Sequence, residues 1–194
     1  YRHPANGETI NFAINNLRMT RTPLLTQVEA LLQLPEHMGN RMSASISGRP
    51  AAGGDGTIWQ YGLETRGLQV AGWSGLQPDG WPALAGGSAD LRLSIEQAAD
   101  RVRNAVVEFD VSELRAEGSA APFGAEGYLE YRHDDAGWLL VADDLRMRTE
   151  RGSWPASSFN VHGGQTTDGK LNSLSAAASY LDLDDLHLLL PWLP

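Results

Sequence analysis

Alternating apolar and polar residues recur along the first two thirds of the chain. Ile10, Phe12 and Ile14 are separated by polar residues, and the same period of two returns in later stretches. A period of two is typical of a half-buried β-strand, because successive side chains point to opposite faces. The pattern therefore predicts strands around residues 10–14, 42–46, 58–70, 91–95 and 105–111.

Residues 24–34 fit two patterns. A helix face would contain Leu24, Leu25, Val28, Leu31 and Leu32. A strand face would contain Val28, Ala30, Leu32 and Leu34. Pro35 ends either element, since proline interrupts both the helical and the strand hydrogen-bond pattern. The sequence leaves both alternatives open here.

A regular series follows in the C-terminal half. We expect strands at residues 127–132, 138–147, 158–161 and 171–181, separated by turns at 134–137, near Gly152 and at 168–169. Short strands joined by such turns indicate a meander of antiparallel hairpins. The predicted fold class is therefore mainly β, an antiparallel meander forming a curved or partly open sheet, with short helices.

One helix is predicted near the C-terminus. Asp184 is a suitable N-cap, with Asp185 in the first turn. The leucines that follow have the spacing i, i+3, i+4, i+7, which is one stripe of a helix. They are Leu186, Leu189, Leu190 and Leu193, and Pro191 limits the helix to about two turns.

The 194 residues are expected to form one β-rich domain, or a fragment of a longer protein, because the chain starts at Tyr1 without a methionine. Glycine and proline interrupt residues 71–88 around Trp73 and Trp81, which indicates a connector. A weak repeat of polar-Leu-polar triplets begins at Asn16, Gly67, Glu113, Asp144 and Asp185. Its spacing suggests β units stacked side by side, although leucine beside arginine is also common by chance.

The net charge and the composition limit the kinds of partner and site that the chain can have. The net charge of −9 disfavours nucleic acid, since phosphate binding requires a basic face. The absence of cysteine excludes disulfides, thiol catalysis and cysteine-ligated metals. No apolar run approaches the ~20 residues of a membrane-spanning helix.

Signals for catalysis are weak, and we expect no enzyme, cofactor or metal site. Gly72–Leu76 misplaces the second glycine of a nucleophile elbow. The acidic pairs Asp134-Asp135, Asp143-Asp144 and Asp184-Asp185 fall at turns, strand ends or a helix cap, where solvated or capping roles are expected. The five histidines lack metal-ligand spacing. The six tryptophans leave open a sugar-binding platform, although tryptophan more often packs inside proteins.

Several segments together resemble one family. They are residues 137–147 (GWLLVADDLRM), Trp154-Pro155, residues 179–186 (SYLDLDDL) and 189–194 (LLPWLP), with upstream matches at 34–42 (LPEHMGNRM), 67–70 and 89–93. In order and spacing they look like the YhdP family of AsmA-like, TamB-related envelope proteins of Gram-negative bacteria. The similarity covers most of the chain and corresponds to that family's domain of unknown function.

The resemblance implies the periplasmic part of a protein anchored in the inner membrane and involved in phospholipid transport to the outer membrane. Acyl chains would lie on an apolar β-groove, and the partners would be phospholipid, neighbouring segments of the parent chain and other envelope proteins. The family implies no catalytic residues. The clearest alternating sets are the candidate lipid-binding residues: Ile10, Phe12, Ile14, Leu91, Leu93, Ile95, Val107, Phe109, Leu129 and Tyr131.

Two further readings stay open. A structural β-domain of the same envelope protein, binding proteins through its strand edges, would use the same residues in a closed core. An envelope hydrolase or glycan-binding domain would need converging carboxylates or a tryptophan platform. An open apolar groove, a filled core and a polar pocket are therefore the three outcomes that separate these functions.

Overall fold

A computed structural model describes residues 13–51, 56–76, 83–99, 101–118, 122–166, 170–182 and 184–185. These residues form one antiparallel sheet of eleven strands. The strands are β1 (Ala13–Thr22), β2 (Leu25–Gln33), β3 (Arg41–Pro50), β4 (Thr57–Gln69), β5 (Leu84–Ala98), β6 (Arg101–Ala116), β7 (Phe123–Asp134), β8 (Gly137–Thr149), β9 (Gly152–Ser153), β10 (Ser157–Gln165) and β11 (Leu171–Ala178).

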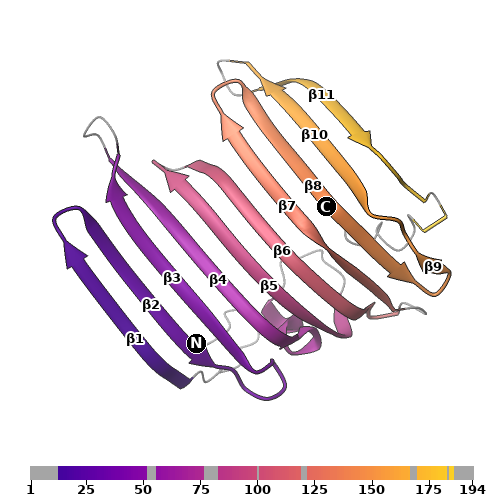
Figure 1. Ribbon diagram of the computed structural model, residues 1–194, viewed down its shortest axis with the longest axis horizontal. Coiled ribbons are helices and arrows are strands. Elements are labelled where there is room, and N and C mark those ends of the chain that lie inside the picture. Colours follow the sequence, from indigo (N-terminus) through magenta and orange to yellow (C-terminus); the bar gives the residue numbers. More distant parts are fainter. Residues whose placement is uncertain are drawn as a thin grey trace.

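The strands lie side by side in chain order (Figure 1). The order runs from β1 to β8 and continues through β10 to β11, and the two-residue β9 pairs with β8 beside this path. Every pairing is antiparallel, which confirms the predicted meander and the mainly β fold class. In Figure 1 the sheet is open, with β1 at one edge and β11 at the other.

The segment 24–34, which fitted both a helix and a strand, contains β2 (Leu25–Gln33) and no helix. β1 and β3 flank this strand and satisfy its backbone hydrogen-bonding groups. The alternation Val28, Ala30, Leu32 continues the same face of both neighbours. Pairing on both sides therefore decides between two patterns that look equal in the isolated sequence.

The predicted connector at residues 71–88 is too long. A 3₁₀ helix, η1 (Val70–Leu76), occupies its first part, and β5 already begins at Leu84. η1 packs at one end of β4 and β5, where the Trp73 Nε1 donates a hydrogen bond to the Met38 carbonyl oxygen at 2.9 Å. A Cβ on Gly72 would lie 2.2 Å from the His37 carbonyl oxygen, so only glycine permits this close approach.

Three of the polar-Leu-polar triplets mark β-bulges. Gly67, Glu113 and Asp144 have φ angles of 62°, 54° and 52°, in the left-handed region. At each position the strand carries one extra residue relative to its partner. The repeat therefore corresponds to a structural device in β4, β6 and β8, where bulges locally increase twist and bend the sheet.

These bulges preserve the apolar face. A residue inserted into a strand would turn every later side chain to the opposite face, because the side-chain period is two. The left-handed residue absorbs the insertion, so that the next residue continues the alternation. Leu68 consequently pairs with Ala89, and Leu114 pairs with Phe123, on the same face as the apolar residues before the bulge.

The predicted C-terminal helix, with Leu186, Leu189, Leu190 and Leu193, lies outside the described residues, as does the predicted turn at 168–169. The strand predicted around residues 42–46 extends farther as β3 and ends only at Pro50.

Candidate functional site

The most extensive chemical feature of the described residues is one apolar face. Directly paired residues of antiparallel strands point to the same side of a sheet, so the register defines each face. One row crosses all ten strands of the path: Leu17, Ala30, Ala44, Leu63, Leu93, Val107, Leu129, Ala142, Phe159 and Ala178. None of these side chains carries a charge or a hydrogen-bonding group.

A second row runs beside the first, two residues along each strand. It contains Met19, Val28, Ile46, Tyr61, Ile95, Ala105, Tyr131, Leu140, Val161 and Ala176. Ten strands spaced ~4.8 Å apart make these rows about 45 Å long. Two adjacent rows of this length form a continuous apolar band across the sheet.

No second layer of described elements covers this band, since every described strand belongs to the one sheet. Its members at the β1 edge are open to solvent: Leu17 is 62% exposed and Met19 is 65% exposed. Leu174 of β11, at the opposite edge, is 63% exposed. The larger buried apolar side chains are Leu34, Met38 and Val70 at the η1 end and Met147 and Trp154 near β9, and within the band Ala142 is buried.

The structure places the described candidate residues on this one face. Leu93, Val107 and Leu129 belong to the first row, and Ile95 and Tyr131 to the second. Ile14, Leu91 and Phe109 lie in a third row, joined through Leu32, Met42 and Thr65. Ile10 and Phe12 lie outside the described residues.

Thr65 interrupts the third row with a hydroxyl group. Its side chain is 3% exposed, and its Oγ1 has no hydrogen-bond partner. A buried hydroxyl without a partner is unfavourable. Thr65 therefore adds an unsatisfied hydroxyl group to the third row.

Apart from Ile14 on β1, the sequence-based set omitted the parts of the face on β1–β4, β8, β10 and β11. Their alternation was visible at Val28, Ala30 and Leu32, but that segment was ambiguous between helix and strand. Leu145 was missed for another reason. The bulge at Asp144 adds one residue to β8, so the alternation of apolar and polar residues is interrupted just before Leu145. A Cβ on Gly127 would lie 3.4 Å from Leu145 Cδ1, which places this leucine over the third row.

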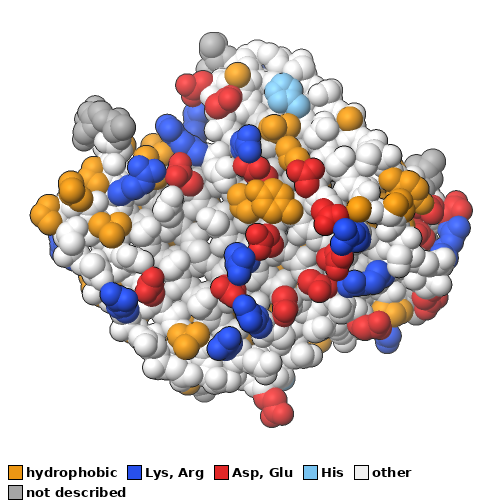
Figure 2. Space-filling view, in the orientation of Figure 1, with side chains coloured by type: hydrophobic (Ala, Val, Ile, Leu, Met, Phe, Trp, Pro, Cys, Tyr) orange, Lys and Arg blue, Asp and Glu red, His pale blue; other side chains and the backbone are white. Residues whose placement is uncertain are grey.

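The opposite face is polar over most of its area. In Figure 2, acidic and basic side chains gather on this face over the middle strands. Arg92 of β5 contacts Glu108 at 3.0 Å and Glu64 at 3.9 Å, on the strands at either side. A shallow hollow of about 510 Å³ lies on the same face, lined by small residues such as Ser43, Ser45 and Gly62.

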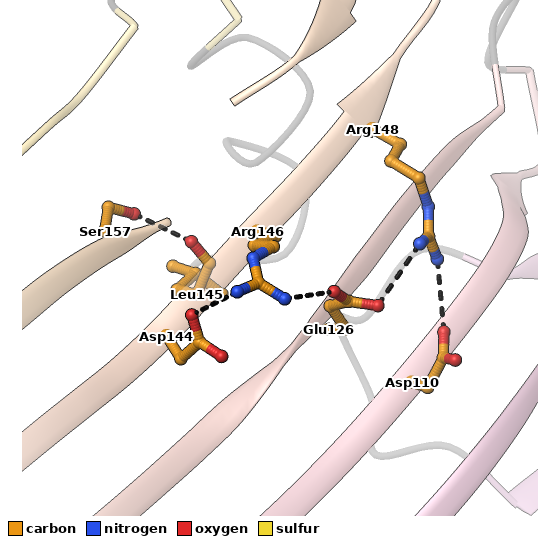
Figure 3. A network of polar contacts seen from close by, with 7 residues as sticks. All are labelled: Asp110, Glu126, Asp144, Leu145, Arg146, Arg148 and Ser157. Carbon is orange, nitrogen blue, oxygen red and sulfur yellow. Dashed lines mark hydrogen bonds and ion pairs between the residues drawn. The ribbon is translucent and has the colours of Figure 1, made fainter. Parts of the chain in front are cut away.

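A linked set of ion pairs lies farther along this face (Figure 3). Arg146 contacts Asp144 at 2.8 Å and Glu126 at 3.0 Å. Arg148 contacts Glu126 at 3.2 Å and Asp110 at 3.1 Å. The hydrogen bond from Arg146 lowers the pKa of the Glu126 carboxyl from its ordinary value, and the charge of Arg148 lowers it further. The Glu126 carboxylate is thus held in its charged form by two arginines of the neighbouring strand.

The pKa values of Glu130 and Tyr128 are also shifted by their surroundings. The hydrogen bond from Arg132 lowers the pKa of Glu130. Burial raises the pKa of Tyr128, and the nearby Glu130 charge adds to that effect. Ion pairs lower the pKa of Glu126 and of Glu130, so neither of these two carboxyl groups is adapted to donate a proton near neutral pH.

The acidic pairs have structural positions. Asp134 Oδ1 accepts hydrogen bonds from the backbone of Ala136 and Gly137, which forms the predicted turn. The expectation of a solvated or capping Asp185 was wrong. Asp185 is 2% exposed, and its Oδ2 accepts hydrogen bonds from Trp154 Nε1 at 2.9 Å and Thr149 Oγ1 at 3.3 Å.

The four described tryptophans do not form a common platform. Trp59 and Trp138 cover Gly48 and Gly163, whose absent side chains leave room for the indole rings. Trp73 and Trp154 donate hydrogen bonds to Met38 and Asp185. Each indole thus has a packing or hydrogen-bonding role of its own.

Within the described ranges, no three His, Asp or Glu side chains gather as metal ligands would. The described helix is also too short to cross a membrane. No protein-family profile, curated protein or solved structure matches the chain. The apolar band is accordingly the candidate site, and its chemistry is non-directional contact with an apolar ligand or partner.

Proposed function

We propose that this protein is a non-enzymatic lipid-handling segment of a Gram-negative envelope protein. In this proposal the acyl chains of phospholipids lie on the apolar band, in the periplasmic part of an inner-membrane-anchored, AsmA-like protein. Its role is phospholipid transport to the outer membrane. The sequence resemblance supports the cellular setting, and the band supports the chemistry.

One observation carries the proposal: two uncharged rows cross ten strands without a second layer of described elements over them. Exposed apolar area of this extent normally marks an interaction surface. Acyl chains gain about 25 cal/mol for each Å² removed from water, and they need no directional partner. A long band of aliphatic side chains meets that requirement, whereas a catalytic site would need converging polar groups.

The test uses neighbouring residues that point to opposite faces. Leu93 lies in the first apolar row, and Ser94 lies on the polar face between Gly62 and Val106. Leu93→Asp places a charge on the band, and Ser94→Asp places the same charge one residue away on the other side. Each purified protein is examined by native mass spectrometry after exposure to phosphatidylethanolamine and phosphatidylglycerol vesicles, followed by solvent extraction.

We expect phospholipid with the natural chain and with Ser94→Asp, and a loss of at least several-fold with Leu93→Asp. Circular dichroism reports whether each variant stays folded. Met19→Asp and Thr20→Asp repeat the comparison at the β1 edge, where Met19 is 65% exposed and a charge will not disturb packing. Absence of lipid from the natural chain, or equal lipid in both variants of each pair, would overturn the proposal.

A structural, protein-binding role is the second candidate, and the edge of β1 favours it. β1 pairs with β2 on one side and with no described strand on the other. Unpaired strand edges readily accept a further strand. This candidate predicts a lipid-free protein whose partner contacts β1, so loss of partner binding on Arg18→Pro, without any lipid in the natural chain, would select it.

A further inference from the structure

One more row of paired residues bounds the apolar band at the strand ends away from η1. We name it the border row, and the same strand register defines it. Unlike the two rows of the band, it carries a guanidinium, an imidazole, an amide and two indoles. Its members are Arg21, Thr26, Gly48, Trp59, Gln97 and Val102 on β1–β6, and His133, Trp138, Gly163 and Leu174 on β7, β8, β10 and β11.

The other end of the same face, where η1 lies, is apolar and closed (Figure 1). Beyond the third row, Leu68 pairs with Ala89, and the pairing continues through Val111 and Ala125 to Met147. Ala89 is 5% exposed and Met147 is 2% exposed. The apolar face therefore has two unlike ends along the strand direction, a closed apolar end at η1 and an amphipathic end at the border row.

Several hydrogen-bond donors of the border row are unused by the described part of the chain. Within it, Arg21 forms no ion pair, and the indole N–H groups of Trp59 and Trp138 form no hydrogen bond. Trp73 and Trp154, by contrast, each donate one. Arg21 is exposed and both border-row indoles are half-buried, so a ligand can reach these donors. Such an indole can contact apolar groups and a hydrogen-bond acceptor at the same time.

The two border-row indoles are positioned by glycines on the neighbouring strands. Trp59 is paired with Gly48, and Trp138 is paired with Gly163. A Cβ on Gly48 would lie 2.7 Å from Trp59 Cζ3, and a Cβ on Gly163 would overlap the Trp138 ring. A larger residue at either glycine would displace the ring. The indoles therefore lie over the sheet, at the edge of the apolar band.

The distance between the border row and the third row suits one acyl chain. Neighbouring rows are two residues apart, which is about 6.8 Å along an antiparallel strand. The border, second, first and third rows therefore span roughly 20 Å. One leaflet of a bilayer has a hydrocarbon thickness of about 15 Å, half of the whole core. An acyl chain that starts at the border row and follows a strand would thus end near the third row.

We propose that the border row binds the phosphate and glycerol of phospholipids whose acyl chains run along the strands toward η1. This assignment rests on the proposed function and adds the direction in which the lipid lies. Phosphate and ester oxygens accept hydrogen bonds, and Arg21, Trp59 and Trp138 supply unused donors. The opposite direction is unfavourable, because a phosphate at the closed η1 end would lose water without gaining a partner.

The experiment uses two phosphatidylglycerol probes that differ only in the position of a diazirine on one acyl chain. In one probe the diazirine is next to the glycerol ester, and in the other it is at the methyl end. Each is irradiated with the natural protein, and mass spectrometry locates the modified residues. We expect the ester-end probe to label Trp59 and Gln97 several-fold more than Leu91 and Phe109, and the methyl-end probe to show the reverse preference.

The possible failures are distinguishable. Exchanged preferences, or equal labelling of both sets by both probes, would overturn the direction and leave the proposed lipid function in place. Absence of labelling on the whole apolar face would overturn the direction and the proposed function together.

A variant tests the headgroup contact itself. The triple variant Arg21→Gln, Trp59→Phe, Trp138→Phe removes the unused donors and keeps two aromatic rings at the border. We expect its retention of phosphatidylglycerol to fall several-fold relative to diacylglycerol with the same chains, which has no phosphate. Arg49→Gln is the control, because Arg49 lies on the polar face and pairs with Glu96 at 3.6 Å. An unchanged ratio of the two lipids in the triple variant would contradict headgroup binding by the border row.

Discussion

On the polar face, Arg92 and Arg148 each join two carboxylates on neighbouring strands, whereas the apolar face crosses the same strands in two rows without a charge. Both faces belong to the same backbone and the same register. The polar face satisfies its own groups by cross-strand pairing. The apolar face has no described layer over it and must meet solvent, a ligand or another segment.

This difference indicates which face of the open sheet is suited to binding a ligand. A folded β-domain normally buries one face against a second layer. Here the stabilising contacts of described residues are concentrated at the η1 end and near β9, where Met38 and Met147 are fully buried. The band between them has one buried side chain, Ala142, and its other members are half-buried or exposed, so substitutions on the two faces should have unequal effects.

The largest expected difference comes from a charge at Ala142, which is 1% exposed in the first apolar row. Ala142→Asp buries an unpaired carboxylate and should destabilise the fold by more than about 4 kcal/mol. Val141→Asp, on the opposite face and half-buried, should cost only about 1 kcal/mol. Urea unfolding followed by circular dichroism measures both, and equal losses would show that the two faces do not differ in this way.

A smaller effect is expected from the bulges that maintain the faces. Glu113 has a φ of 54°, and its left-handed conformation keeps Leu114 on the apolar side. Glu113→Gly should leave the free energy of unfolding within about 1 kcal/mol of the natural chain, because glycine adopts this conformation freely. Glu113→Val should destabilise by about 1–2 kcal/mol. Thermal unfolding compares the pair, and tolerance of valine would argue against a constrained bulge.

A stabilising change is expected at Thr65. Its buried hydroxyl lacks a partner, and Thr65→Val replaces that hydroxyl with a methyl group of similar size. The free energy of unfolding should rise by about 1 kcal/mol. Chemical denaturation measures the change. A loss of stability would show that the Thr65 hydroxyl has a stabilising role on the apolar face.

The smallest expected effect is the pH dependence of stability that the ion pairs of the polar face produce. Arg146 and Arg148 lower the pKa of Glu126 below its ordinary value near 4.5. The pairing therefore contributes stability above that ordinary pKa, and the contribution is lost as the pH falls through the lower folded-state pKa. NMR titration should show Glu126 with a low midpoint, and Arg146→Gln should raise it. An unchanged midpoint in the variant would contradict the role of Arg146.

Much of the sheet could be predicted from the sequence because alternation is local. The period of two at Leu91, Leu93 and Ile95 placed β5 and its apolar side correctly, and Asp134 indicated the turn before β8. Leu145 could not be assigned in the same way, since the left-handed Asp144 adds a residue that the alternation does not reveal. A bulge is a property of two paired strands and is weakly encoded in either one.

Contacts between residues far apart in the sequence also could not be predicted. The burial of Asp185 depends on Trp154 and Thr149, which are 31 and 36 residues away in the chain. Its neighbours in sequence favour a helix cap, and nothing local indicates the distant indole. Similarly, β2 could be distinguished from a helix only through its pairing with β1 and β3.

The central claim is that acyl chains lie on one face of this sheet, and a photo-reactive phospholipid tests it most directly. A phospholipid with a diazirine in its acyl chain is irradiated with the natural protein, and mass spectrometry locates the modified residues. Along β5 we predict modification at Leu91, Leu93 and Ile95, and none at Arg92 or Ser94. Labelling of both sets alike, or of neither, would contradict the account.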